Sequence, residues 1–197
     1  CHTCDIRNSE EIKKALKNVS SLYALIANAG IGGENQYGEQ DRWQEVVDTN
    51  LTGTYKTIQE CLPLIKKNSA PFKKIIIISS ILARLGVPGY SAYCASKSGL
   101  LGLTRSLAAE HSGDGILVNA LCPGWVDTDM AQEGLQGFAD ALNVSKNEAY
   151  KEAMKPVPLG KMSQPEEVAK LVSFLISKEQ SSISGQTLDI NNGALMP

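Results

Sequence analysis

Four short aliphatic runs limit most strongly how this chain can fold. The second of them contains four consecutive isoleucines, and the runs occupy residues 22–30, 73–80, 115–124 and 185–193. Apolar residues do not alternate with polar ones within the runs, which is typical of strands buried on both faces of a parallel sheet. We therefore expect four such strands in this chain.

Helical patterns separate these runs. They occupy residues 8–19, 40–66, 91–111 and 163–177. In the last of them, Ser163 and Glu166 have the spacing of a capping box. Alternation of strands with helices predicts an α/β fold with right-handed crossovers. Residues 125–160 break the alternation, and a long insertion after a strand end is often a functional lid.

Composition excludes several classes of protein. The 197 residues are enough for one domain, so we treat 1–197 as a single domain. A net charge of −2 without a basic stripe argues against nucleic-acid binding. No apolar run approaches the roughly 20 residues that span a bilayer, and no signal peptide is visible, so we expect no membrane partner.

The five cysteines are odd in number and scattered, which argues against a disulfide framework and for a reducing, cytoplasmic setting. Cys1, His2 and Cys4 have a metal-like spacing, but no second pair of cysteines accompanies them. A structural zinc site needs four ligands, so we expect no metal site.

Polar or glycine-bearing motifs follow the first three strands. They are Asn28-Ala29-Gly30, Ser79-Ser80 and Pro123-Gly124. Because the carboxyl ends of parallel strands share one edge, these motifs should converge on one ligand-binding crevice. Asn50 continues the apolar stripe of the helix at 40–66. It is either a packing asparagine bonded to nearby backbone or a residue that holds a water or carbonyl at the site.

Tyr93 and Lys97 are four residues apart at the start of the helix at 91–111, which places them on one face. A surface pair is the simple alternative. A cation near a phenol, together with any positive ligand, lowers the pKa of the phenol and makes it a usable acid or base near neutral pH. With Ser80 to bond the reacting oxygen, the set suits proton transfer to a carbonyl or from an alcohol.

These motifs resemble those of the short-chain dehydrogenase/reductase family. Its Asn, Ser and Tyr-x-x-x-Lys pattern is found here at Asn50, Ser80, Tyr93 and Lys97. "ANAG" at 27–30, "PGWVDTDM" at 123–130 and "SGQTLDINNG" at 184–193 are similar to further family elements. The resemblance implies a three-layer, doubly wound Rossmann-type parallel sheet and a cofactor of the NAD(H) or NADP(H) type.

The resemblance also implies roles for residues. Tyr93 would exchange the proton, Lys97 would lower its pKa, Ser80 would orient the substrate, and Asn50 would hold a relay water. The substrate would meet Ser80, Leu82, Tyr90, Tyr93 and Trp125. The cofactor would meet Asp5, Ile6, Asn28, Ala29, Gly30, Asn50, Tyr93, Lys97, Pro123, Gly124, Val126 and Thr128.

The sequence departs from the family pattern in three places. Ala27 and Tyr23 replace an Asn and an Asp, changes that we expect to be structural. The family's first strand–helix units and their glycine-rich pyrophosphate turn have no counterpart here. We therefore expect a fragment that starts near the end of the family's third strand, binds cofactor poorly and exposes the strand ending at Asn28 as an apolar edge.

Within the family, the chain looks closest to 3-oxoacyl-carrier-protein reductases and polyketide ketoreductases, which reduce a 3-oxoacyl thioester on acyl-carrier protein or CoA. Alternatives are a 3-hydroxybutyrate, sugar or other alcohol dehydrogenase, and a non-catalytic scaffold. Residues 81–92 and the lid would select the substrate. Arg84 is either an anion contact or a surface residue, and Trp125 a pocket wall or a lid anchor. The family resemblance implies a homotetramer or homodimer.

Overall fold

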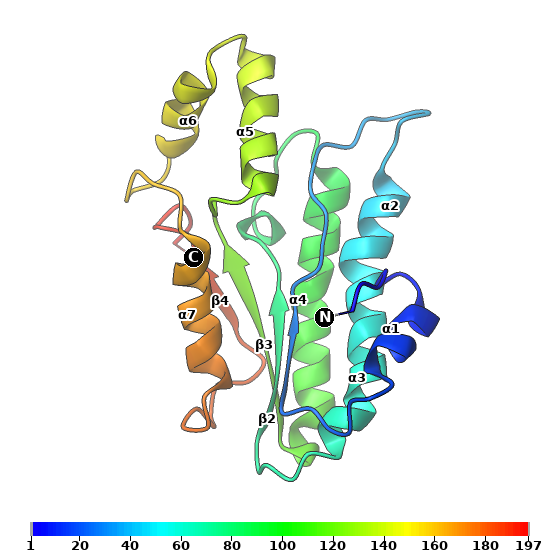
Figure 1. The fold of residues 1–197 in the computed structure, drawn as a ribbon. Helices are drawn as coiled ribbons and strands as arrows, with labels where there is room; N and C mark the ends of the chain where they lie inside the picture. The colour runs from blue at the N-terminus through cyan, green and yellow to red at the C-terminus, as the bar shows by residue number, and fades with distance from the viewer. Residues whose placement is uncertain (1, 197) are drawn as a thin grey trace.

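In a computed structural model that describes residues 2–196, one parallel sheet is covered by helices on both faces (Figure 1). Its strands lie side by side in chain order, and each of the four expected runs is confirmed, with shorter ends. They are β1 (Ala24–Ala27), β2 (Lys73–Ile78), β3 (Ile116–Pro123) and β4 (Thr187–Ile190). Cys1, part of the metal-like spacing, lies outside the described residues.

The consecutive isoleucines of β2 divide between the two faces of the sheet. Ile75 and Ile77 pack into the core beneath α3 (Thr54–Lys66) and α4 (Ser91–His111). Ile76 packs on the other face with Leu175 of α7 (Pro165–Ile176). All three isoleucines are fully buried. The absence of alternation in the sequence therefore reflects a strand with a helix layer on each side.

The helix expected at 40–66 is interrupted by a π-helix. Its parts are α2 (Trp43–Val47), the π-helix Asp48–Gly53 and α3, while α1 (Ser9–Leu16) packs against α3. A π-helix inserts an extra residue per turn and is frequent at functional sites. The apolar spacing predicted one continuous helix because buried apolar residues recur through the pieces, with Val46 in α2 and Ile58 and Ile65 in α3.

Residues 125–160, the expected lid, contain two helices, α5 (Asp129–Leu142) and α6 (Lys146–Met154), which stand beyond the carboxyl ends of the strands (Figure 1). They share a small core of their own, formed by Leu135, Ala139, Ala149, Ala153, Met154, Val157 and Met162. This segment is therefore a helical pair attached to the sheet rather than part of its layers.

The predicted capping box of α7 is displaced by one residue. Gln164 and Glu167 form it, not Ser163 and Glu166. The backbone of Ser163 is already bonded to Trp125 and Asp127, at 2.9 Å each. Because those bonds hold Ser163 in an extended bridge to Val126, the helix begins only after it.

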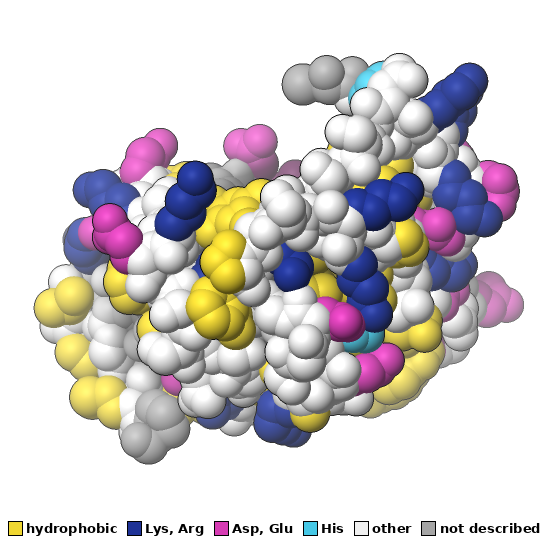
Figure 2. Space-filling view, turned by 90° about the horizontal axis from the view of Figure 1, so that it is seen from below, with side chains coloured by type: hydrophobic (Ala, Val, Ile, Leu, Met, Phe, Trp, Pro, Cys, Tyr) yellow, Lys and Arg dark blue, Asp and Glu magenta, His cyan; other side chains and the backbone are white. Residues whose placement is uncertain are grey.

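Among the described residues, β1 pairs only with β2, so it forms an edge of this sheet, and Ile26 is 40% exposed there. Residues 2–5, which we expected to follow the end of a strand, have no regular secondary structure, and residues 6–7 form a turn. Seen from the amino ends of the strands, basic, acidic and hydrophobic side chains are intermixed (Figure 2). No helix among residues 2–196 is long and apolar enough to cross a membrane.

Candidate active site

The structure brings the four predicted catalytic residues together from three elements. Tyr93 and Lys97 lie in the first two turns of α4, and the ammonium of Lys97 is 5.6 Å from the centre of the Tyr93 ring. Ser80 follows β2, and Asn50 lies in the π-helix. All of them lie at the carboxyl edge of the sheet, where open α/β sheets bind ligands. The pairing of Tyr93 with Lys97 is thus not a surface contact.

Lys97 is a buried ammonium with a specific partner. The residue is 5% exposed, and Nζ donates a hydrogen bond to the carbonyl of Ile78 at the end of β2, at 3.0 Å. Burial lowers the pKa of Lys97 to about 8, because a charged form loses its hydration in the interior. The backbone carbonyl of Lys97 accepts from Ser79 Oγ at 2.9 Å, which ties α4 to the same strand end.

The pKa of the Tyr93 phenol is raised in this chain, whereas the sequence predicted a lowered one. Burial raises the pKa of its phenol, and a hydrogen bond with Ser80 opposes that rise. The motif predicts that Lys97 lowers this pKa, but in the chain by itself desolvation is the larger effect. The ammonium lies over the ring and donates to Ile78 rather than to the phenol oxygen. The phenol is therefore protonated at neutral pH.

Asn50 is fully buried, and its amide bonds to the loop that follows β1. Oδ1 accepts from the amide N–H of Ile31 at 2.8 Å, and Nδ2 donates to the carbonyl of Ile31 at 2.9 Å. Nδ2 also donates to Ser96 Oγ at 3.2 Å, and Ser96 Oγ donates to the carbonyl of Tyr93 at 2.8 Å. Asn50 therefore joins the end of Asn28-Ala29-Gly30 to the helix turn that carries Tyr93.

The space beside Lys97 suits a ligand with hydroxyl groups. A Cβ added to Gly30 would lie 3.0 Å from Asn50 Oδ1, which it would crowd, and 3.5 Å from Lys97 Nζ, which it would only contact. Lys97 has three N–H donors and directs one of them to Ile78, so the others can bind a sugar diol. Asn28 and Ala29 are exposed at this edge. These residues fit the nicotinamide ribose of a dinucleotide.

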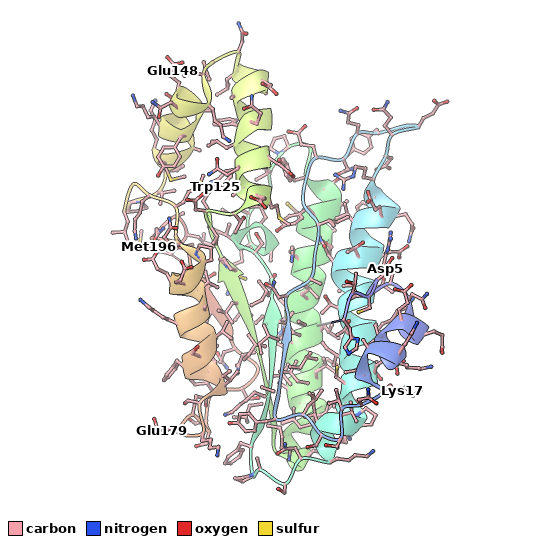
Figure 3. The ribbon with its side chains drawn as sticks, in the orientation of Figure 1. Asp5, Lys17, Trp125, Glu148, Glu179 and Met196 are labelled. Carbon is pink, nitrogen blue, oxygen red and sulfur yellow. The ribbon has the colours of Figure 1, made fainter. Side chains whose placement is uncertain are left out.

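The remaining cofactor candidates fall into two groups. Pro123 ends β3, and Gly124, Val126 and Thr128 follow it. Thr128 caps α5, and Gly124 lies against Asn191. Asp5 precedes α1 and lies on the side of the molecule formed by α1, α2 and α3 (Figure 3). Arg7 pairs with Asp5 at 2.6 Å and lowers the pKa of that carboxyl, while Ile6 packs on Gly53.

The substrate candidates line two sides of the same edge. Leu82 lies in the short 3-10 helix Ile81–Ala83 after Ser80, and Tyr90 directly precedes α4. Trp125 lies at the base of α5 and packs against the α5–α6 core (Figure 3), as a lid anchor would. Arg84 forms an ion pair within the chain, in which its Nε lies 3.2 Å from the carboxylate of Asp189 in β4.

Two residues that the sequence reasoning missed join this site. Ser96 links Asn50 to Tyr93 through two hydrogen bonds. Its position three residues after Tyr93, on the same face of the helix, could have indicated this role from the sequence. Asn35 lies in the β1–α2 loop and bonds to residues 91 and 92. No local pattern marks these two contacts, since residues 91 and 92 are more than fifty residues away from Asn35.

Comparison with known proteins places this geometry in a family. A family model described as enoyl-(acyl carrier protein) reductase matches residues 1–194. The 3-oxoacyl-[acyl-carrier-protein] reductase FabG of Rickettsia typhi is 39% identical over 98% of this chain and 76% of that protein. A single-substitution variant of actinorhodin polyketide ketoreductase, crystallised with NADPH, is 34% identical and superposes with a TM-score of 0.90 over 98% of this chain and 76% of its own.

The chain belongs to the short-chain dehydrogenase/reductase family. It is accordingly an oxidoreductase, and the resemblance seen in its motifs extends along the whole chain. Ligand-free aldohexose dehydrogenase of Thermoplasma acidophilum is a further neighbour, with a TM-score of 0.87, 28% identity, and coverage of 97% of this chain and 76% of its own. Proteins named for different substrates thus share this fold.

Proposed function

We propose that this dehydrogenase/reductase reduces the keto group of 3-oxoacyl thioesters on acyl-carrier protein or CoA, with NADH or NADPH, in the cytoplasm. The observation that supports it most is the grouping of Tyr93, Ser80, Lys97 and Asn50 at the carboxyl edge of the sheet. The substrate class is that of similar proteins, among them the 3-oxoacyl-[acyl-carrier-protein] reductase of Rickettsia typhi.

In this mechanism Tyr93 gives its proton to the keto oxygen. Because burial raises the pKa of the phenol, it is protonated and ready to act as an acid at neutral pH. Ser80 donates a hydrogen bond to the same oxygen and holds it near the phenol. The ammonium of Lys97, over the ring, stabilises the phenolate that forms. The nicotinamide supplies the hydride when it is bound.

Other residues hold the reactants in place. Lys97 would bind the nicotinamide ribose, with Asn28, Ala29, Gly30 and the segment 123–128 beside it. Asn50 would hold a water on the route by which the proton returns. Leu82, Tyr90 and Trp125 would contact the acyl group beneath the lid at 125–160. We further propose that α3, α4 and β4 form interfaces of a homodimer or homotetramer, which light scattering would test.

The test is a substrate panel on the complete gene product, followed by nicotinamide absorbance with NADH and with NADPH. Acetoacetyl thioester should be reduced. Tyr93→Phe should lower kcat by about 10²- to 10⁴-fold, because the acid is removed. Tyr37→Phe is the matched control, since Tyr37 is 87% exposed and should leave kcat unchanged.

Each other outcome contradicts the proposal in a different way. Reduction of crotonyl thioester without reduction of acetoacetyl thioester would indicate an enoyl reductase, as the description of the family model reads. Oxidation of an aldohexose or of 3-hydroxybutyrate alone would indicate a dehydrogenase of that substrate. Cofactor binding with no turnover of any substrate would indicate a scaffold.

A further inference from the structure

Asn35 is a buried side chain in an otherwise exposed loop. The loop between β1 and α2 exposes residues 36–41 to solvent, yet Asn35 is only 5% exposed. Burial of an amide is unfavourable unless its donors and acceptors are bonded. The partners of Asn35 therefore indicate why it is held there.

Those partners lie at the start of the helix that carries Tyr93. Oδ1 of Asn35 accepts from the backbone N–H of Ala92 at 3.1 Å and from Ser91 Oγ at 3.0 Å. Its own backbone N–H donates to the carbonyl of Gly89 at 2.8 Å. The residue at the N-cap position of α4, Tyr90, makes no side-chain capping bond. Asn35 thus caps α4 from a different loop.

The cap acts on the turn that contains the acid. Ser91, Ala92 and Tyr93 are the first three residues of α4, and the first N–H groups of a helix have no partner within it. From the other side, Ser96 and Asn50 hold the carbonyl of Tyr93. The backbone around Tyr93 is thereby fixed at both ends, by Asn35 before it and by Asn50 after it.

The two asparagines also fix one loop. Asn50 bonds to both backbone groups of Ile31, four residues before Asn35. Nδ2 of Asn35 donates to Asp41 Oδ1 at 3.3 Å, and the same Oδ1 accepts from the N–H of Trp43 at the start of α2. The loop is therefore tied to α4 and to α2 at once. It passes beside the amino end of α4 in Figure 1.

We propose that Asn35 is a positioning residue for catalysis: it caps α4 from the β1–α2 loop and so sets the orientation of the Tyr93 phenol. This inference rests on the proposed function of Tyr93 as the acid. A misplacement of a reacting group by a fraction of an ångström to an ångström is enough to slow an enzyme substantially. Loss of the cap should therefore slow proton transfer more than it weakens substrate binding.

The test compares Asn35→Ala with Gln36→Ala, an exposed neighbour in the same loop, in the complete gene product. Asn35→Ala should lower kcat for 3-oxoacyl reduction by about tenfold, with KM changed by less than about threefold. It should also raise the solvent deuterium isotope effect on kcat, because proton transfer becomes slower. Gln36→Ala should change neither.

Exchanging the amide of residue 35 with the carboxylate of residue 41 tests the hydrogen-bond geometry without changing the net charge. Asn35→Asp keeps the acceptor for Ala92 but places its carboxylate against that of Asp41, so kcat should stay low. Asn35→Asp with Asp41→Asn restores a donor–acceptor pair and should recover kcat to within about twofold. Recovery of the melting temperature without recovery of kcat would overturn the proposal.

Amide exchange separates this proposal from the proposed function. In Asn35→Ala the N–H of Ala92 should exchange faster, whether or not the enzyme turns over 3-oxoacyl thioesters. A wild-type protein that reduces no carbonyl refutes the proposed function. If wild type is active, then unchanged kcat and isotope effect in Asn35→Ala, with faster exchange at Ala92, refute the positioning role and leave Asn35 as a cap alone.

Discussion

Tyr93 and Lys97 show opposite pKa changes for one physical reason. Lys97 is buried and Tyr93 half-buried, and desolvation disfavours the charged form of each, so the phenol keeps its proton while the ammonium loses its own more easily. At pH 7 the phenol is neutral and Lys97, with a pKa of about 8, is still mostly charged. Near neutral pH the pair therefore has a proton to give and a cation to stabilise the resulting phenolate.

This pairing predicts the pH dependence of carbonyl reduction. The kcat/KM value for the nicotinamide cofactor reflects ionisations of the enzyme without bound cofactor. It should therefore fall as pH rises through about 8, where Lys97 loses its charge. The fall should approach about tenfold per pH unit. The measurement is a pH–rate profile of acetoacetyl thioester reduction between pH 6 and pH 10.

Lys97→Arg is the control for that profile. Because guanidinium keeps its charge throughout this range, the fall near pH 8 should disappear even if the absolute rate is lower. An identical fall in both proteins would show that another group governs it.

Close approach between α4 and the π-helix places Asn50 beside Tyr93. A Cβ added to Gly99 of α4 would lie 2.8 Å from Leu51 Cδ2 and 3.1 Å from Leu51 Cδ1. Leu51 directly follows Asn50 within the π-helix. The absence of a side chain at residue 99 thus lets the two elements pack at the distance that the Asn50–Ser96 hydrogen bond requires.

Gly99→Ala should therefore separate these elements. The added methyl must displace Leu51, so we expect the free energy of unfolding to fall by about 1 kcal/mol despite the better helix propensity of alanine. We expect kcat to fall with it, because Asn50 moves with Leu51. The measurements are urea unfolding and kcat for acetoacetyl thioester.

Gly102→Ala is the matched control in the same helix. A Cβ there meets no atom within 4 Å, so alanine should raise the free energy of unfolding by about 0.5–1 kcal/mol and leave kcat unchanged. Equal effects of the two substitutions would mean that the contact with Leu51 does not matter.

The elements that could be predicted from sequence are those with local causes. Ile75, Ile76 and Ile77 indicated a strand covered on both faces, and α4 was predicted with its observed ends. The π-helix could not be predicted, because its extra residue is stabilised by contacts of Asn50 with Ile31 and Ser96, which are remote in sequence. The shift of the α7 cap likewise depends on a bridge from Ser163 to residue 126.

At the site, motifs predicted which residues meet but not their electrostatics. The i, i+4 spacing singled out Tyr93 and Lys97, and the family resemblance added Ser80 and Asn50 to the same set. In the chain by itself the pKa of Tyr93 is raised, whereas the spacing predicted a pKa lowered by Lys97 and a positive ligand, since the degree of burial is a property of the packed structure and not of the spacing. Asn35 was missed for a similar reason, as its cap on Ala92 joins the β1–α2 loop to α4, which only the fold brings together.

The burial of Lys97 also affects the stability of the whole molecule. Its pKa is about 8 in the folded chain against an ordinary value of 10.5, so between these values the unfolded chain binds more protons. Stability therefore rises with pH across this window, and the unfavourable contribution of the buried charge is fully present below pH 8. Cys61 acts in the opposite direction, because burial raises its pKa to about 11 and its contribution to stability is lost as pH rises from 9 to 11.

Comparison with Lys97→Met isolates the lysine, since the cysteine titrates in both proteins. From pH 7 to pH 9.5 the free energy of unfolding of wild type should rise by about 2 kcal/mol relative to that of Lys97→Met. Urea unfolding of both proteins at one concentration and without nucleotide measures this difference. If the free energies of unfolding of the two proteins changed equally with pH, the ammonium beside Ile78 and Gly30 would be as well solvated in the folded chain as in the unfolded one. In that case the pH–rate profile could not be assigned to Lys97, because the same desolvation underlies both effects.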